Sequence, residues 1–407
     1  MPSNYRNFRN SVPWLILCLE AGFIVLFYFL FSDYNELRSI ISYPVFQDVS
    51  HMVIFGFGFF LTFLKRYGFS STGFNLLIVV LGVQCSMLTE GVLNFLLQKN
   101  HQDVLTRITK AAVSMTAVVI STGPVLGKTN PLQLILMTVV EVIFFRISRW
   151  INTTFLQVPD NVSMMHVHLF GAYFGMAVSS KFSQPSPKSE KNASTSNSDL
   201  LSMLGTLFLW VFWPSFNAVL TEDGERNAIY NTYFANAASA VTAFMLSVLT
   251  TRGGKFRMTD IRSAVLAGGI AVSYTAHSIE HPWIAMILGL LSSVITILGS
   301  YFSQRCLNPG LKIHDTSGVH FTFGFPGMLG AIAQVILLVI KNWTNSPRLG
   351  YLVMIHIGAF CQTISAALIT GFATGLILNL KPFKTIPVSK YFEDQLYWEF
   401  PHLAVGF

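Results

Sequence analysis

Long apolar stretches recur along this chain of 407 residues, and they restrict its fold more than any other feature. A run of about 20 apolar residues is long enough to cross a bilayer as an α-helix. Lipid offers no hydrogen-bond partners, so each crossing must satisfy its own backbone groups. The predicted fold class is therefore an all-α polytopic membrane protein. We predict twelve spans, at about residues 13–32, 50–66, 73–96, 107–126, 131–150, 163–181, 201–220, 229–250, 260–277, 282–302, 318–340 and 350–379.

The scarcity of charged residues indicates the same class. They make up 11% of the chain, whereas a soluble domain carries about a quarter. When the spans are threaded in order, most of the 26 Lys and Arg residues fall on the side of the N-terminus. Positive residues gather on the cytoplasmic side of membrane proteins, so we expect a multi-pass plasma-membrane protein with both termini cytoplasmic. The net charge of +7 then indicates contact with lipid headgroups and no nucleic-acid partner.

A polar segment rich in Ser, Pro and Lys divides the chain near its middle. Such a composition is typical of a flexible linker. Five spans on each side of it would form two halves of opposite orientation, with a pathway between them. Within a single membrane domain, we predict an extra N-terminal helix and first outside loop at 1–49, a first half-repeat at 50–180, a cytoplasmic linker at 181–200, a second half-repeat at 201–340, a last helix at 341–380 and a cytoplasmic tail at 381–407.

The stretch HVHLFGAYFG at 166–175 places two histidines in an apolar span. Residues two apart on a helix point about 200° away from each other, so His166 and His168 must face different surroundings. An ionisable residue inside a span suggests function, although a hydrogen bond to a neighbouring helix would explain it equally well. Asp160 precedes the same span and would either stabilise the helix start or attract a cation to a pore mouth.

A second unusual stretch, DTSGVHFTFGFPG at 315–327, begins the eleventh span. His320 and Phe323 lie three residues apart, on one helical face, and Asp315 is placed to cap the helix start. We expect the carboxylates near other spans to make helix–helix hydrogen bonds: Glu20, Glu90, Glu141 and Glu280. Because the chain has no zinc, phosphate-loop, dinucleotide or nucleophile-elbow motif, we expect no enzyme activity, catalytic residue, metal or cofactor.

Several long blocks resemble the ammonium transporter/Rh family, and within it the Rh blood-group polypeptides of the D/CE type. They run in the family's order over nearly the whole chain: YPVFQDVSHMVIFGFGFFLTFLKRYGFS (43–70), VLGKTNPLQLILMTVVEV (125–142), HLFGAYFGMAV (168–178), LFLWVFWPSFNA (207–218), SAVLAGGIAV (263–272), DTSGVHFTFGFPG (315–327) and KYFEDQLYWEFPHLAVGF (390–407). The resemblance implies an ammonium-transporter-like fold, with an inverted five-helix repeat and further helices, assembled as trimers with a pore in each protomer. Conducting members line that pore with two facing histidines, an outer pair of phenylalanines and a supporting aspartate.

Carrying these positions over gives a mixed result. His168 matches the first pore histidine, and Asp160 matches the family aspartate. Phe216 matches one gate phenylalanine, whereas Thr122 stands where conducting Rh proteins have the other. Phe323 replaces the second pore histidine, and His320 matches the earlier histidine of that motif without filling the lost position.

The resemblance therefore predicts a subunit of an Rh complex with weak or absent ammonium conduction, because Phe323 cannot relay a proton. The alternative is a conducting channel for NH3, ammonium or CO2, which His168, Asp160 and Phe216 favour. Expected partners are a homotrimer, or a heterotrimer with a glycosylated Rh-family protein. The tail KYFEDQLYWEF would either contact an adaptor such as ankyrin at the membrane skeleton or pack beneath the pore; we weigh these equally.

Overall fold

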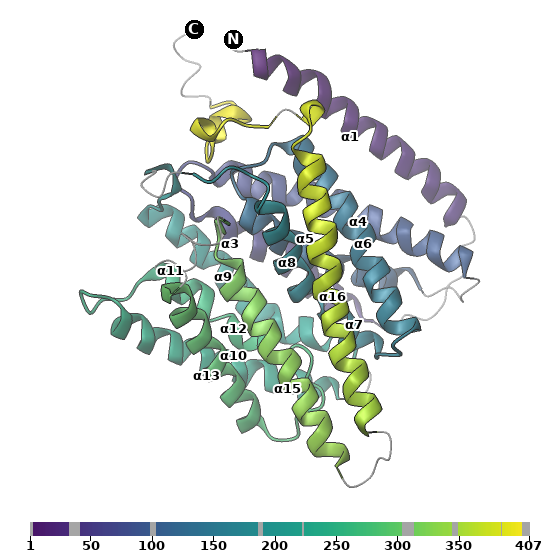
Figure 1. The fold of residues 1–407 in the computed structure, drawn as a ribbon, viewed down its shortest axis with the longest axis vertical. Helices are drawn as coiled ribbons and strands as arrows, with labels where there is room; N and C mark the ends of the chain where they lie inside the picture. The colour runs from purple at the N-terminus through teal and green to yellow at the C-terminus, as the bar shows by residue number, and fades with distance from the viewer. Residues whose placement is uncertain are drawn as a thin grey trace.

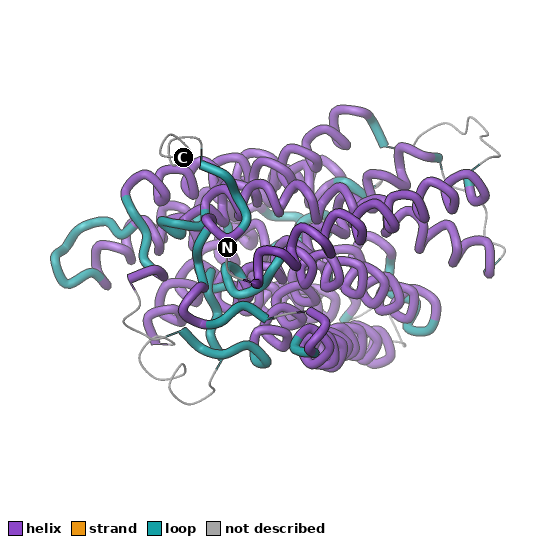
Figure 2. The backbone as a smooth tube through the Cα atoms, turned by 90° about the horizontal axis from the view of Figure 1, so that it is seen from above, coloured by secondary structure: helices purple, strands orange, loops and turns teal. Residues whose placement is uncertain are grey.

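The computed structural model describes residues 3–31, 41–97, 103–185, 190–221, 224–302, 313–343, 349–383 and 385–400. Figure 2 shows that the described part consists of helices and loops, without strands. Residues 33–40 of the predicted first outside loop and the last seven residues of the tail lie outside these ranges. The expected all-α fold is confirmed.

Nine helices in the described part are long and apolar enough to cross a membrane. Most predicted spans agree with them within a few residues, and 282–302 agrees at both ends. The second begins earlier than predicted, because Pro44 supports a helix start at Tyr43. Their bounds are α1 (Ser3–Leu30), a helix running through α2 (Tyr43–His51), η1 (Met52–Gly56), α3 (Phe57–Phe60) and η2 (Leu61–Phe63), α4 (Gly68–Leu96), α5 (Val104–Val125), α9 (Ser196–Ala218), α10 (Glu225–Thr250), α13 (Pro282–Phe302), η5 (His320–Gly324) with α15 (Phe325–Asn342), and α16 (Leu349–Leu378).

The three remaining predicted spans are helical but are not single apolar helices. The span predicted at 131–150 is α6 (Pro131–Thr154), whose outer end carries Arg146 and Arg149. The span at 163–181 is broken at His166 into α7 (Asp160–Met165) and α8 (Val167–Ser179). The span at 260–277 consists of α11 (Met258–Ala264), α12 (Ala267–Ala271) and turns. Broken helices inside a membrane protein persist where neighbouring helices supply hydrogen bonds.

The helices form two groups on either side of the linker. Elements α2 to α8 pack together in the first group and α9 to α15 in the second, while α3 contacts α9 across the boundary. The long α16 crosses in front of both groups, and α1 lies along an outer edge where it contacts α4 and α6 (Figure 1). The predicted boundaries at 49/50 and 200/201 fall inside α2 and α9, and the division into two half-repeats stays a prediction.

Glycines bring α8 unusually close to α5. A Cβ added at Gly171 would lie 2.3 Å from the carbonyl oxygen of Ala117, and one at Gly175 would lie 2.5 Å from that of Ser121. Two glycines four residues apart form a flat strip on one helical face, which lets helix backbones approach in membranes. The sequence GAYFG therefore fixes the α5–α8 contact and, with it, the orientation of the histidines that precede it.

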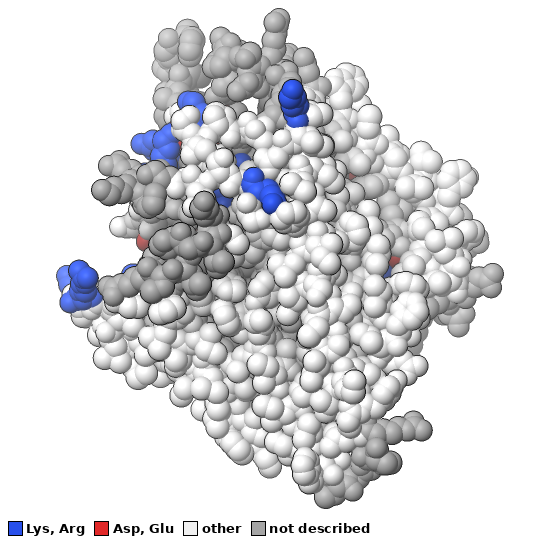
Figure 3. All heavy atoms as spheres, in the orientation of Figure 1, with Lys and Arg blue, Asp and Glu red and all other residues white. Residues whose placement is uncertain are grey.

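The outer surface is largely uncharged. Figure 3 shows Lys and Arg side chains gathered towards the end that carries the C-terminal tail, and wide uncharged areas elsewhere. Large apolar side chains such as Val241, Leu249 and Ile369 are exposed on the long helices. Such a surface fits lipid or a partner helix.

We expect Gly171→Ala to destabilise the fold by about 1–3 kcal/mol, because the new methyl group would meet backbone atoms that have no room to move. Gly358→Ala in α16 is the matched control, since its added Cβ would meet nothing within 4 Å. This change should leave stability unchanged or raise it slightly through helix propensity. Thermal unfolding in detergent micelles measures both, and equal midpoints for the two variants would contradict the proposed α5–α8 contact.

Candidate functional site

His168 lies in the first turn of α8, buried completely between the two helix groups. Its ring centroid lies 5.7 Å from that of Trp213 and 5.9 Å from that of Phe216, both on α9. Neither ring nitrogen has a hydrogen-bond partner among the described residues. Buried polar groups are rarely left in this state, so His168 presents an unused donor and an unused acceptor in an aromatic environment.

His166 faces a different side of the helix, as its spacing from His168 predicts. Its Nδ1 lies 2.8 Å from Oγ1 of Thr363 on α16 and 3.2 Å from Nδ2 of Asn152 on α6. The ring also contacts Tyr274 edge-on, at 5.5 Å between centroids. His166 is thus the histidine that joins neighbouring helices, whereas His168 has only ring contacts.

Phe323 lies in the π-helical turn η5, at the start of the last helix of the second group. It is 1% exposed, and its ring packs against Phe57 at 5.9 Å and Phe60 at 6.2 Å, from the first group. These phenylalanines directly follow the other π-helical turn, η1. Single π-helical turns are frequent at functional sites. Here they bring three phenyl rings together between the halves.

His320 does not share the surroundings of Phe323, although a regular helix would place them on one face. Its ring contacts Phe325 at 4.7 Å and Tyr173 at 5.9 Å. The wider π-helical turn separates the two side chains, because it adds a residue to the turn. As predicted, Asp315 caps this segment, accepting hydrogen bonds from the backbone N–H groups of Gly318 at 3.0 Å and His320 at 2.9 Å.

The structure does not bring Thr122 beside Phe216, so the predicted outer pair is wrong. Thr122 lies in the last turn of α5, near the loop in which Lys128 contacts His314. His314 in turn contacts Asn192, which shortly precedes α9. Phe216 lies 20 residues beyond the start of α9, about 30 Å further along the helix axis. Thr122 lines a pocket with Tyr67 and Ser71 instead.

Asp160 is the first residue of α7 and forms two ion pairs, which sequence reasoning did not identify. Its Oδ2 lies 3.0 Å from Nζ of Lys110, and its Oδ1 pairs with Arg149. The carboxylate therefore joins α5, α6 and α7 while remaining 44% exposed. The available signal was the presence of Lys110 and Arg149 within apolar runs, where charged groups are expected to pair with each other.

The remaining carboxylates follow the predicted pattern of contacts between helices. Glu90 pairs with Arg146 at 2.9 Å, Glu141 accepts a hydrogen bond from Ser121, and Glu20 accepts one from Gln84 at 3.2 Å. Glu280 departs from this pattern, because it is exposed in the bend just before α13. In the described residues, no group of three or more His, Cys, Asp or Glu side chains is arranged to hold a metal ion.

A shallow polar depression, too narrow to hold a water molecule, lies next to residues that adjoin Phe216 and Asp160 in sequence. Its walls come from the ends of α7 and α9 and from the turns after α12. They are formed by Asn161, Val162, Met165, Asn217, Leu220, Thr221, Ser273, Tyr274 and His277. The depression therefore lies at the end of the molecule opposite the C-terminal tail.

We expect Asp160→Asn to destabilise the protein by roughly 1–3 kcal/mol, because it removes the negative charge that pairs with Lys110 and Arg149, two largely buried cations. Adding Lys110→Met should recover part of the loss, since it removes one of the two cations that Asp160 neutralises. Asp260→Asn, which breaks a single i,i+3 pair with the partly exposed Arg257, is the control and should cost less than about 1 kcal/mol. Unfolding midpoints in detergent measure all three, and equal losses for Asp160→Asn and Asp260→Asn would contradict a structural role for the outer ion pairs.

Comparison with known proteins places this geometry in a family. The model of the Ammonium Transporter Family matches residues 12–397. An "RH-like protein" of Macaca mulatta is 42% identical, and the "Blood group Rh(CE) polypeptide" of Homo sapiens is 41% identical; both matches cover all of this chain and all of the relative.

Solved structures agree with the sequence matches. The structure of Nitrosomonas europaea Rh50, whose title concerns the mechanism of conduction by the Rhesus protein family of channels, aligns with a TM-score of 0.77 and 27% identity, over 92% of this chain and 96% of that one. A "Sensor Amt Protein" aligns at a TM-score of 0.70 and 19% identity over 85% and 94%, which supports the fold alone. The chain is therefore a multi-pass membrane protein of the ammonium transporter family, within its Rh branch.

Proposed function

We propose that this chain is mainly a subunit of an Rh complex and that its own pore conducts ammonium weakly or not at all. The observation that carries the proposal is the ring cluster of Phe323, Phe57 and Phe60 between the two halves. The resemblance places a histidine at position 323 in conducting relatives. A phenyl ring there has no atom that donates or accepts a conventional hydrogen bond.

The physical consequence concerns the passage of a polar solute between the halves. Moving a polar molecule through an apolar passage costs free energy unless hydrogen bonds replace those it made with water. The ring neighbours of His168 are Trp213 and Phe216, and those of Phe323 are also aromatic. A solute that leaves His168 therefore finds no second imidazole at position 323. This supports weak conduction of NH3 and disfavours conduction of the ammonium ion even more strongly.

The proposed complex is a trimer, either of this chain alone or with a glycosylated Rh-family protein, in the plasma membrane with both termini cytoplasmic. Exposed apolar side chains on α9 and α10 would support packing against a neighbouring protomer, among them Val211 and Val241. Mass measurement of the complex extracted in a mild detergent distinguishes the homotrimer from the heterotrimer.

The tail constrains how a membrane-skeleton contact could form. Carboxylate oxygens of Asp394 accept hydrogen bonds from the backbone N–H groups of Phe69 and Ser70, at 2.9 Å and 2.8 Å. Nε1 of Trp398 donates one to Ser70 at 2.9 Å. These contacts favour packing of the segment beneath the membrane domain. An adaptor such as ankyrin would therefore bind the exposed side of the tail, where Lys390 and Glu399 lie.

The test of the proposed function is stopped-flow uptake of NH3 into proteoliposomes containing this chain alone. We expect the parent to match protein-free liposomes and Phe323→His to exceed them. One restored hydrogen bond of about 1 kcal/mol would raise the rate of NH3 passage through the protein roughly fivefold over that of the parent protein. Phe325→His is the matched control, because Phe325 packs against His320 and Phe321 outside the ring cluster.

The alternative is a conducting channel for NH3, ammonium or CO2, and the unpaired nitrogens of His168 are the feature that favours it. Uptake by the parent that disappears in His168→Ala would establish this alternative and refute the block at Phe323. Equal uptake by Phe323→His and Phe325→His would show that any added imidazole loosens the packing, which would also refute the proposed role of Phe323.

A further inference from the structure

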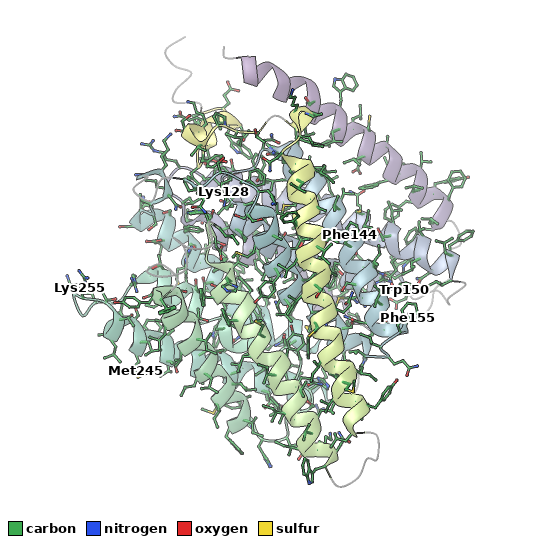
Figure 4. All side chains as sticks on the ribbon, viewed as in Figure 1. Lys128, Phe144, Trp150, Phe155, Met245 and Lys255 are labelled. Carbon is green, nitrogen blue, oxygen red and sulfur yellow. The ribbon has the colours of Figure 1, made fainter. Side chains whose placement is uncertain are left out.

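Lys128 is the one lysine among the largest fully buried side chains of the described part, with 1% of its surface exposed. It lies in the turn between α5 and α6, outside the spans, and Figure 4 labels it within the fold. Its Nζ donates hydrogen bonds to Oγ of Ser179 at 2.8 Å and to the carbonyl oxygen of His314 at 2.7 Å. A buried amine requires such partners, because burial removes it from water.

The site around the Lys128 amine is built from both halves of the molecule. Ser179 ends α8, the helix of His168, and His314 begins the segment that leads to Phe323. Oγ of Ser179 also lies 2.8 Å from the carbonyl oxygen of His314 and 3.2 Å from that of Pro124 in α5. Two oxygens from separate segments thus contact the nitrogen, and the Pro124 carbonyl oxygen contacts the Ser179 hydroxyl that forms one of them.

The electrostatic surroundings favour a positively charged or strongly donating group. The C-terminal ends of α5 and α8 meet here, and helix C-termini carry partial negative charge. Burial lowers the pKa of Lys128 to about 7, while the nearby Asp315 carboxylate acts in the opposite direction. Burial and the neighbouring Lys128 lower the pKa of His314 to about 4, so its imidazole is neutral near pH 7. Lys128 therefore exchanges between amine and ammonium near neutral pH.

We propose that these oxygens form a primary-amine site at the inner junction of the two halves and that the Lys128 side chain fills it permanently. The site's ligand class is a primary amine or its ammonium ion, held by the Ser179 hydroxyl and the His314 carbonyl group. In the parent protein no free amine binds there, because the chain supplies its own. The inference rests on the fold and is independent of whether the pore conducts.

The site also connects to the tail. Gly127, with φ of +73°, directs its carbonyl oxygen to the backbone N–H of Phe392 at 2.9 Å, and the Phe392 ring lies against it. The same turn therefore holds the amine on one side and the tail on the other. Loss of the Lys128 amine should therefore weaken the contacts of this turn with Ser179, with His314 and with the tail together.

Chemical rescue tests this proposal. Lys128→Ala removes three methylene groups and the amine, which n-propylammonium chloride supplies from solution. We expect the variant to lower the unfolding midpoint in detergent by about 5 °C or more, and millimolar propylammonium to restore at least half of the loss. Ser179→Ala in the same chain should abolish the rescue. Lys255→Ala is the matched control, since Lys255 is exposed and distant (Figure 4). Its unfolding midpoint should equal that of the parent and should not change when propylammonium is added.

Propan-1-ol and tetramethylammonium chloride, at matched ionic strength, separate the amine site from other effects. Propan-1-ol fills the same volume without an ammonium group, and tetramethylammonium carries the charge without N–H donors. Rescue by propylammonium alone supports the proposal. Equal rescue by either control compound, absence of rescue, or a midpoint unchanged by Lys128→Ala overturns it. If Lys128→Ala is not recovered folded, the folded yield from membranes solubilised with each compound replaces the midpoint and is judged in the same way.

Discussion

The close backbone contact between α5 and α8 is the constraint on which the rest of the structure depends. Gly171 and Gly175 allow it, and any side chain at either position would collide with the backbone of α5. The contact holds α8 in register, so that His168 at its beginning faces α9 and Ser179 at its end meets the turn after α5. In a bilayer, where burial of apolar surface does not drive helices together, such close packing supplies much of the association.

This register gives His168 and Phe323 different ring neighbours. Those of His168 are Trp213 and Phe216, and those of Phe323 are Phe57 and Phe60. An interruption of regular α-helix positions each of the two side chains. For His168 it is the helix break at His166, and for Phe323 it is the π-helical turn at 320–324. The chain therefore keeps the fold of the family with a phenyl ring at position 323, and a fold alone does not determine what such a position does.

Much of the fold could be predicted from the sequence, because span length and apolar composition are properties of local segments. The twelve predicted helical regions exist, but hydropathy could not show that the region around His166 is broken or that 260–277 consists of two short helices and turns. Those breaks depend on hydrogen bonds from other helices, such as that from Asn217 to the carbonyl oxygen of Gly269. The start of the second span at Tyr43 was also missed, although Pro44 marks it, because the preceding residues carry no span signal.

The candidate site was less predictable, and the errors have a common cause. His166 and His168 have the different surroundings that their spacing predicts, whereas Thr122 lies in the last turn of α5, away from Phe216. The direction in which α5 crosses the membrane already contradicted the pairing of Thr122 with Phe216, since Thr122 ends a helix that Asp103 caps at its start. Lys128 escaped notice because a lysine in a polar turn looks solvated. Only the approach of Ser179 and His314, distant in sequence, reveals that the turn is closed over by the second half, so a charge at an apparent loop can belong to the interior of the protein.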